Sequence, residues 1–212
     1  MARPKAAKPP DRRQRRSQAS CRRALLELIC EQSYDAITVD QIVERADIGR
    51  ATFYAHYADK GALLRALSDE LISDAANRAR QIDPGATPGS YSGNAAAEVL
   101  KHAGEHPALY RLVISGGGGP EPRAQLFATL RTAVAEIFTD VAKSLKRTPA
   151  MSMDMTSIAF TGALLALTEA WLDGVVTGTP NEVAAIFMHG QVEGLRWALG
   201  LKPDALVFKP PQ

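Results

Sequence analysis

The sequence predicts an all-α protein in which a small three-helix N-terminal domain of helix-turn-helix type precedes a larger helical domain. Apolar residues recur at helical spacing through most of the 212 residues, and no strand-like alternation persists. Clusters of proline and glycine separate the helical stretches. With 46% hydrophobic residues the chain can bury a substantial core, so we expect a soluble globular protein.

The N-terminus carries most of the positive charge. Residues 1–23 hold nine Lys or Arg and one acidic residue, Asp11, whereas the whole chain has a net charge of only +2. Prolines 4, 9 and 10 favour disorder up to about residue 11, and we expect residues 1–16 to form a basic disordered arm. Such an arm is either a solvated tail or a segment attracted to phosphates.

Three short helices follow, in a domain predicted to span residues 17–60. The first has an apolar stripe of Leu25, Leu28 and Ile29 and ends near Ser33. The second begins with the capping-box sequence TVDQ at residues 38–41, and Asp47 to Gly49 then impose a turn. Helices joined by so short a turn predict a helix-turn-helix, whose second member lies in the DNA major groove.

The segment IGRATFYAHYADKGALL, residues 48–64, forms the third helix and the start of a long fourth one at Asp59. Helical spacing turns Ile48, Phe53 and Tyr57 inward, although Tyr57 could also contact a phosphate. The outward side chains are small, or flat with a polar tip, as close approach to base edges requires. These outward residues are Arg50, Ala51, Tyr54 and Ala55.

Each polar side chain of this segment has a possible DNA partner. Arg50 can present its planar fork to a guanine, or contact a phosphate from the same position. Tyr54 can contact a thymine methyl group or donate its hydroxyl to a phosphate. We expect His56 and Lys60 to bind the phosphate backbone.

The stretch TVDQIVERADIGRATFYAHYADKGALLRAL resembles the DNA-binding segment of TetR/AcrR-type transcriptional regulators. The T-x-x-x-I-x-x-x-A spacing, the T-F-Y-x-H-Y core and the D-K-x-x-L-L entry occur together, and the resemblance covers roughly residues 20–70. Members of that family are homodimeric helical repressors that bind a small-molecule inducer. The resemblance implies phosphate contacts for Thr38, Thr52, Tyr54, His56 and Lys60, and base contacts for Gly49, Arg50, Ala51 and Tyr54.

Two departures from the family pattern stand out. Asp47 occupies the usual turn glycine, and Gly49 the usual serine or threonine cap. Because Asp tolerates the left-handed conformation and Gly is a weaker but adequate N-cap, we expect the motif to survive. Ser33-Tyr34 also replaces a glycine-aromatic pair, which predicts slight strain at the end of the first helix.

Residues 61–202 are expected to form the second domain, followed by a tail at 203–212. The helices predicted at 153–176 and 181–199 are apolar on more than one face, so one side must pack on a partner. We therefore expect a homodimer through these last two long helices, and an operator that is a near-palindrome in double-stranded DNA.

We expect a small-molecule inducer to bind between the helix of 59–83 and those of 91–176, in a mostly apolar cavity with a few polar groups. Glu169 and Asp173 either attract a cationic ligand or form the wet stripe of their helix. The candidate lining residues are His102, Tyr110, Phe127, Arg131, Met155 and Glu169.

Other chemistries receive little support. The SGGGG run at 115–119 lacks the lysine and hydroxyl of a phosphate-binding loop, and no third ligand joins His102 and His106. We expect no enzyme activity, cofactor, metal or membrane span, and a cytoplasmic location with both cysteines reduced. The alternatives are a helical ligand-binding protein or enzyme that does not bind DNA, and a DNA-binding activator or architectural protein.

Overall fold

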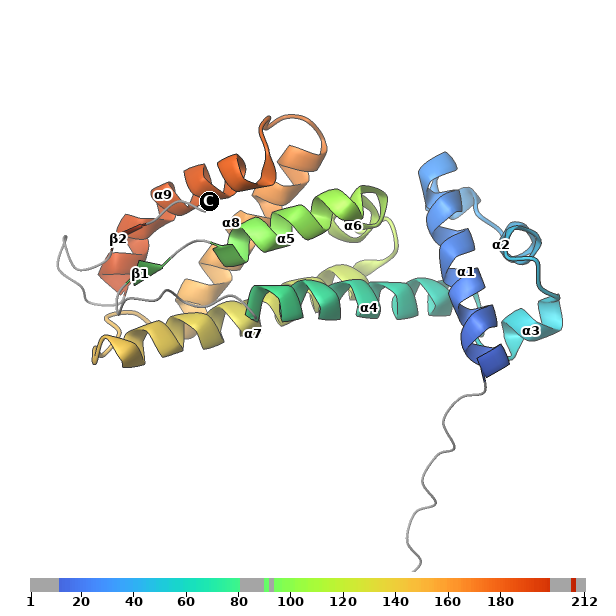
Figure 1. The fold of residues 1–212 in the computed structure, drawn as a ribbon, viewed down its shortest axis with the longest axis horizontal. Helices are drawn as coiled ribbons and strands as arrows, with labels where there is room; N and C mark the ends of the chain where they lie inside the picture. Colours follow the sequence, from blue (N-terminus) through green and yellow to red (C-terminus); the bar gives the residue numbers. More distant parts are fainter. Residues whose placement is uncertain (1–11, 81–89, 92–93, 199–206, 209–212) are drawn as a thin grey trace, which may run out of the picture. The chain divides into compact units, whose positions relative to one another are not determined.

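The computed structural model describes residues 12–80, 90–91, 94–198 and 207–208. The chain divides into two compact units, Met1–Leu67 and Ser68–Gln212, which we call unit 1 and unit 2. The prediction of an all-α fold is confirmed, because most of the described residues are helical (Figure 1). The boundary between the units lies inside a helix, after Leu67.

Unit 1 packs three helices around a small apolar core. It contains α1 (Arg12–Glu31), the 3-10 turn η1 (Tyr34–Ala36), α2 (Val39–Arg45), α3 (Arg50–Tyr54) and the start of α4 (Lys60–Arg80). The helices α1, α2 and α3 all contact one another. The largest fully buried side chains of this unit are Leu25, Ile37, Ile42, Phe53, Leu63 and Leu64.

The helix α1 begins earlier than the sequence analysis expected. Arg12 to Arg16, which we had placed in a disordered arm, form its first turns. Arginine and glutamine are good helix formers, and here their intrinsic propensity outweighs the mutual repulsion of the charges. The remainder of the expected arm, residues 1–11, lies outside the described residues.

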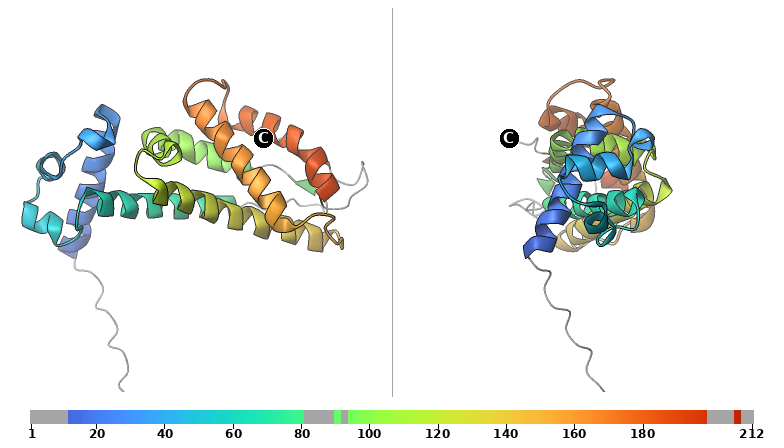
Figure 2. Two further views of the ribbon diagram at one scale, coloured as in Figure 1. Left: turned by 180° about the vertical axis from the view of Figure 1, so that it is seen from behind. Right: turned by 90° about the vertical axis from the view of Figure 1, so that its right-hand side faces the viewer.

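Unit 2 is a bundle of α5 (Asn94–Glu105), α6 (Pro107–Ser115), α7 (Pro120–Ser144), α8 (Met153–Leu172) and α9 (Pro180–Ala198), together with the second half of α4. The helix α8 contacts α5, α6, α7 and α9 (Figure 2). As predicted, the chain breaks at His106, and Pro107 occupies the first turn of α6. The helix α8 ends at Leu172, four residues before the predicted end at 176.

A short pairing of strands joins distant parts of unit 2. Ser90 and Tyr91 (β1) pair in parallel with Val207 and Phe208 (β2). The strand β2 lies in the segment 203–212, which is expected to be a tail, because a two-residue strand leaves no periodicity in the sequence.

Among the described residues, one helix, α8, has the length and apolar composition that a membrane-spanning helix would need. Core helices of water-soluble proteins can have the same length and composition, and 44% of the most apolar stretch of α8 is buried within the protein.

Candidate nucleic-acid interface

The turn before α3 has the geometry expected from its unusual residues. Asp47 adopts the left-handed conformation with φ of 53°. Gly49 is the N-cap of α3 in an extended conformation, with φ of −77° and no side-chain cap. At α2 the capping box is complete, since Thr38 Oγ1 accepts from the Gln41 amide at 3.3 Å and the Thr38 amide donates to Gln41 Oε1 at 2.8 Å. The hydroxyl of Thr38 thus already has a structural role, while the residue remains exposed.

The helix α3 is held by two aromatic rings and exposes a third. Phe53 is completely buried and Tyr57 is 6% exposed, whereas Tyr54 is 55% exposed. The rings of Phe53 and Tyr54 meet edge to face with centroids 5.4 Å apart. Arg50, Ala51 and Thr52 are exposed as well, so the inward and outward sides of α3 are as predicted. The half-exposed Ile48 is buried less than expected.

Arg50 is engaged on the protein surface. Its Nη2 forms an ion pair with Oδ1 of Asp40, a residue in the first turn of α2. From sequence, Asp40 is recognisable only as a carboxylate inside the capping-box segment.

Lys60 does not point to solvent as a phosphate-binding lysine would. Its ammonium group donates three hydrogen bonds to backbone carbonyls, to Tyr34 O at 2.8 Å, Asp35 O at 3.1 Å and Ile37 O at 2.7 Å. The same nitrogen lies 4.6 Å from the centre of the Tyr34 ring. A lysine has three donors and all are used here. Its geometry is therefore that of a clamp between η1 and the start of α4, and the expected phosphate contact stays a prediction.

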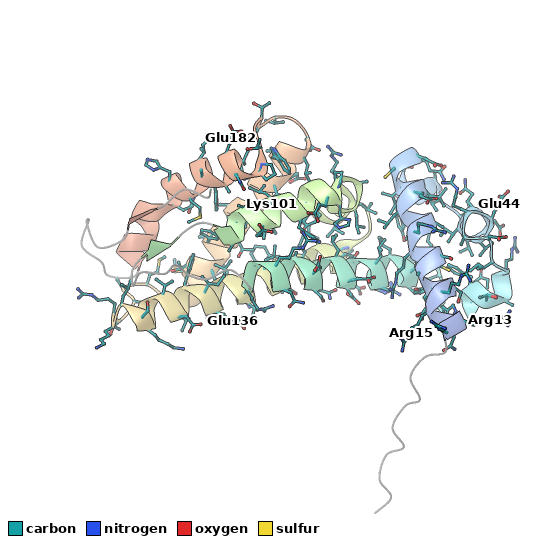
Figure 3. The ribbon with its side chains drawn as sticks, in the orientation of Figure 1. Arg13, Arg15, Glu44, Lys101, Glu136 and Glu182 are labelled. Carbon is teal, nitrogen blue, oxygen red and sulfur yellow. The ribbon has the colours of Figure 1, made fainter. Side chains whose placement is uncertain are left out.

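His56 connects the turn after α3 to α1. Its Nε2 lies 2.7 Å from Oγ of Ser17, and the ring is half-buried. The first turns of α1, which carry Arg13 and Arg15, lie on the same side of unit 1 as α3 (Figure 3). The contact between Ser17 and His56 therefore brings the basic start of α1 close to α3 and the turn after it. The two residues are 39 positions apart, so helical spacing could not reveal this contact.

Unit 2 separates the six residues proposed for ligand binding. Phe127 and Glu169 line a cavity of about 660 Å³ between α6, α7 and α8. Arg131 lies in a second, more polar cavity of about 380 Å³, where it pairs with Asp154 at 3.5 Å. Met155 is 63% exposed and lines neither cavity.

The larger cavity is mostly apolar and carries a negative charge from Glu169 and a positive charge from Arg123. Glu169 is one of the predicted lining residues, whereas Arg123 is not. None of its lining residues comes from α4, so this cavity differs from the one expected beside the helix of 59–83. Asp173 is directed to Arg111 instead, at 3.1 Å, so it does not join Glu169. The lining residues are Ile114, Gly116, Pro120, Arg123, Ala124, Leu126, Phe127, Gly162, Leu165, Ala166 and Glu169.

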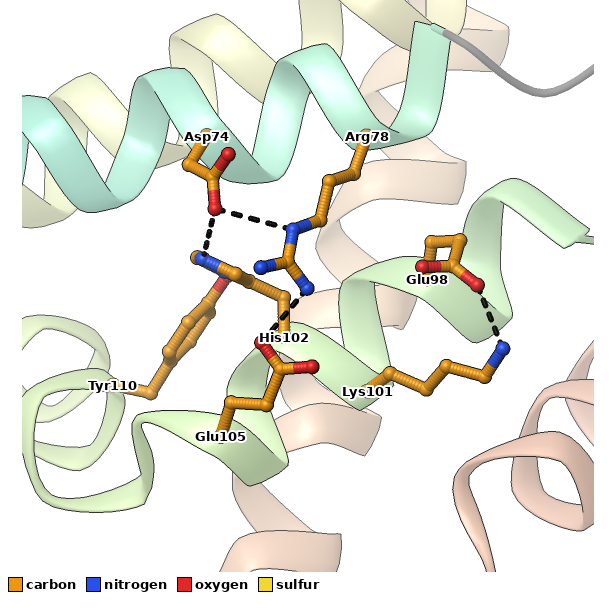
Figure 4. A network of polar contacts seen from close by, with 7 residues as sticks. All are labelled: Asp74, Arg78, Glu98, Lys101, His102, Glu105 and Tyr110. Atoms are coloured by element: carbon orange, nitrogen blue, oxygen red, sulfur yellow. Dashed lines mark hydrogen bonds and ion pairs between the residues drawn. The ribbon is translucent and has the colours of Figure 1, made fainter.

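His102 and Tyr110 belong to a polar network that joins α4, α5 and α6 (Figure 4). His102 is 1% exposed; its Nδ1 lies 2.9 Å from the Tyr110 hydroxyl and its Nε2 lies 3.1 Å from Asp74 Oδ2. Burial lowers the pKa of His102 and raises that of Tyr110. A neutral imidazole that donates to Asp74 and accepts from Tyr110 satisfies both ring nitrogens, so we assign these contacts as hydrogen bonds.

Arg78 completes the network by bridging Asp74 at 3.1 Å and Glu105 at 2.8 Å. Among the described residues, no group of three or more His, Cys, Asp or Glu side chains could hold a metal ion.

The N-terminal segment of the chain is similar to known proteins. Residues 22–67 match the family model described as bacterial regulatory proteins, tetR family. Two uncharacterized HTH-type transcriptional regulators of Bacillus subtilis (strain 168) are similar: YxbF is 41% identical over 58 residues, 27% of this chain and 15% of its own length. YdeS is 32% identical over 80 residues, 38% of this chain and 35% of its own length. The alignments thus span about a third or less of these relatives.

Solved structures share the fold over most of the chain. A TetR transcriptional regulator from Streptococcus agalactiae 2603V has a TM-score of 0.64 at 18% identity, covering 85% of this chain and 96% of its own. NalD of Pseudomonas aeruginosa, described as the secondary repressor of the MexAB-OprM multidrug efflux pump, has a TM-score of 0.66 at 15% identity, covering 85% and 97%.

The three helices of unit 1, with α3 exposed, have the architecture of the helix-turn-helix class. Residues 22–67 match the tetR family model, and the fold of the chain is similar to that of solved TetR regulators, so the resemblance drawn from the sequence is confirmed.

Proposed function

We propose that the protein is a cytoplasmic, dimeric transcriptional repressor that binds a near-palindromic DNA operator and is released from it by a small molecule. The observation that carries the proposal is the orientation of α3. Phe53 and Tyr57 anchor the helix, while Arg50, Ala51, Thr52 and Tyr54 face solvent. Small residues beside an arginine and a tyrosine suit the major groove, where the backbone must approach the base edges.

The start of α1 supports DNA binding independently. Its first five residues include four exposed arginines, and its first turn has no acidic residue. Positive charge at a helix N-terminus is unfavourable because it opposes the helix dipole. Phosphates near Ser17 and His56 would neutralise this charge, and we therefore assign Arg12 to Arg16 to the DNA backbone.

The surfaces of α8 and α9 support dimerisation. Met155, Ile158 and Ile186 are 63%, 46% and 73% exposed. On α9, Gly190 and Gly194 follow Ile186 at four-residue intervals, and a Cβ added to either glycine would meet no atom within 4 Å. A face that is apolar and open enough for a second helix to approach suits an isologous contact. Two recognition helices related by a twofold axis would read two half-sites about one DNA turn apart.

The cavity at Phe127 and Glu169 is our candidate for the inducer site. Its volume of about 660 Å³ is within the usual range for small-molecule sites, and its walls are mostly apolar. Ile114 and Gly116 at the end of α6 form one wall, and Tyr110 on the same helix contacts His102, which contacts Asp74 on α4. We propose that ligand binding shifts α6 and is transmitted by this contact chain to α4, which continues into unit 1. Release requires that the ligand bind the low-affinity state more tightly than the DNA-bound state.

Substitution of Tyr54 tests the DNA-binding assignment. Tyr54→Ala removes a ring that is 55% exposed and meets the core ring of Phe53 edge to face. The variant should keep its helical content and its dimer while losing affinity for the operator by about tenfold or more. Electrophoretic mobility shift on the DNA directly upstream of the gene measures the affinity. A variant that binds this DNA as tightly as the wild type would contradict the role given to α3.

A further inference from the structure

The ion pair between Asp40 and Arg50 is the strongest feature of unit 1 that the proposed function leaves unexplained. It joins the first turn of α2 to the first residue of α3, through Oδ1 of Asp40 and Nη2 of Arg50. The two side chains are 60% and 67% exposed. Within the described part of the chain, Arg50 forms no other ion pair.

Stability is a poor explanation for this pair. An ion pair so exposed contributes little to stability, because water screens the two charges and both long side chains lose freedom. A carboxylate beside a DNA-reading helix is also repelled by phosphates, which costs affinity for every DNA sequence. A role in the recognition of DNA explains the pair better than a role in stability.

We infer that Asp40 is a positioning residue that determines specificity by orienting Arg50 toward one base pair. The inference rests on the proposed binding of an operator by α3. A guanidinium group has five N–H donors in one plane, and a bidentate contact to guanine uses two of them. Asp40 engages Nη2 and leaves the other donors for the base. An arginine that is already oriented loses less side-chain freedom on binding, which favours the matched site.

The same carboxylate penalises mismatched DNA. When no guanine is present, Arg50 swings to a phosphate and leaves Asp40 close to the DNA without its counter-charge. Asp40 thus lowers the affinity for unmatched sequences and supports the affinity for the matched one. Specificity is the difference between these two affinities, so Asp40 increases it.

Selection from random-sequence duplexes tests the inference with the full-length dimer. The wild type, Asp40→Asn, Arg50→Ala and the matched control Glu44→Gln are each used to enrich bound DNA. Glu44 is an exposed carboxylate on α2 for which the structure shows no ion pair with Arg50. Each variant is checked for helical content and thermal unfolding, and its affinity is measured on the duplex enriched by the wild type and on random DNA.

We expect Asp40→Asn and Arg50→Ala to lose the base preference at the same position of each half-site. The ratio of affinities for enriched over random DNA should fall about tenfold for Arg50→Ala, and severalfold for Asp40→Asn. In the Arg50→Ala background, Asp40→Asn should not change the ratio further, because Asp40 acts through Arg50. The Glu44→Gln control should keep the ratio.

Other outcomes overturn the inference. If Asp40→Asn tightens binding to both DNAs equally and keeps the base preference, Asp40 is only a repulsive surface charge. If the wild type enriches no sequence at all, the proposed function fails as well, and that result is distinguishable because it appears before any variant is compared.

Discussion

The Nζ atom of Lys60 lies 2.7 Å from the carbonyl oxygen of Ile37 and also donates to the carbonyls of Tyr34 and Asp35. These bonds fasten the end of η1 to the first turn of α4. Lysine at this position would, from sequence alone, be assigned to phosphate binding. We propose from this geometry that its main role is in the stability of unit 1.

Lys60→Met should therefore destabilise the protein by about 2 kcal/mol, because it removes hydrogen bonds from a charged donor and leaves three carbonyls without it. Chemical denaturation followed by circular dichroism measures the change. The control Arg65→Met removes an exposed cation on the same helix and should cost less than about 0.5 kcal/mol. Once folded, Lys60→Met should retain the wild-type salt dependence of DNA binding. If the slope of log affinity against log salt concentration falls by about one, Lys60 does contact a phosphate.

The buried His102 makes the stability of unit 2 depend on pH. Burial lowers its pKa, so the folded protein favours the neutral ring, while the unfolded chain takes up a proton near the ordinary value of 6.5. The stabilisation is complete above pH 6.5 and is lost as the pH falls toward the lower pKa of the folded state.

His102→Gln should remove this part of the pH dependence, which can reach about 1.4 kcal/mol per pH unit for one proton. Denaturation curves from pH 7.5 downward measure the effect against His189→Gln, in which an exposed histidine is changed. If wild type and His102→Gln lose stability in parallel on acidification, His102 does not hold the neutral form that its contacts imply.

Filling the larger cavity should abolish ligand binding without affecting DNA affinity. Ala124→Phe places a ring into the cavity from α7, whereas Ala128→Phe places the same ring on an exposed position of α7 outside it. Anilinonaphthalene sulfonate, an apolar anionic dye that suits Phe127 and Arg123, serves as the probe. We expect dye fluorescence with the wild type and Ala128→Phe and severalfold less with Ala124→Phe. Equal fluorescence from all three would rule out this cavity as the dye's site.

A charge on the exposed face of α9 should dissociate the dimer. Ile186→Arg would bury a guanidinium without a partner in the proposed interface, a substitution that costs several kcal/mol. Analytical ultracentrifugation should show a monomer with weakened operator binding. Val175→Arg is the control, since Val175 is 79% exposed and lies outside both helices of the proposed interface. A dimer that survives Ile186→Arg would place the interface elsewhere.

The local signals in the sequence predicted unit 1 well. The capping box at Thr38 and Gln41, the left-handed Asp47 and the inward rings of Phe53 and Tyr57 all follow from rules that act within a few residues. The roles of Lys60 and His56 depend on partners up to 39 residues away, Ser17 among them. Spacing along one helix carries no information about such contacts, so the sequence could not reveal them.

Unit 2 shows the same division between helices and sites. Periodicity located the helices, and the His106-Pro107 break was correct because it depends on the proline itself. The lining of the ligand site was predicted from the types of the residues alone. That reasoning put His102 and Tyr110 in the same cavity as Phe127 and Glu169. In the structure His102 contacts both Tyr110 and Asp74, and neither member of this first pair lines the cavity. Phe127 and Glu169 do line it.

The most direct test of the account is the binding of the purified protein to DNA directly upstream of its gene, titrated against salt, with random DNA of equal length as the control. The account predicts one protected, near-palindromic site that is bound at least about a thousandfold more tightly than random DNA, with affinity for both falling steeply as salt rises. Equal, weak binding to both DNAs, repeated when fragments from the whole genome are offered, would contradict the assignment of α3 as a sequence-reading helix.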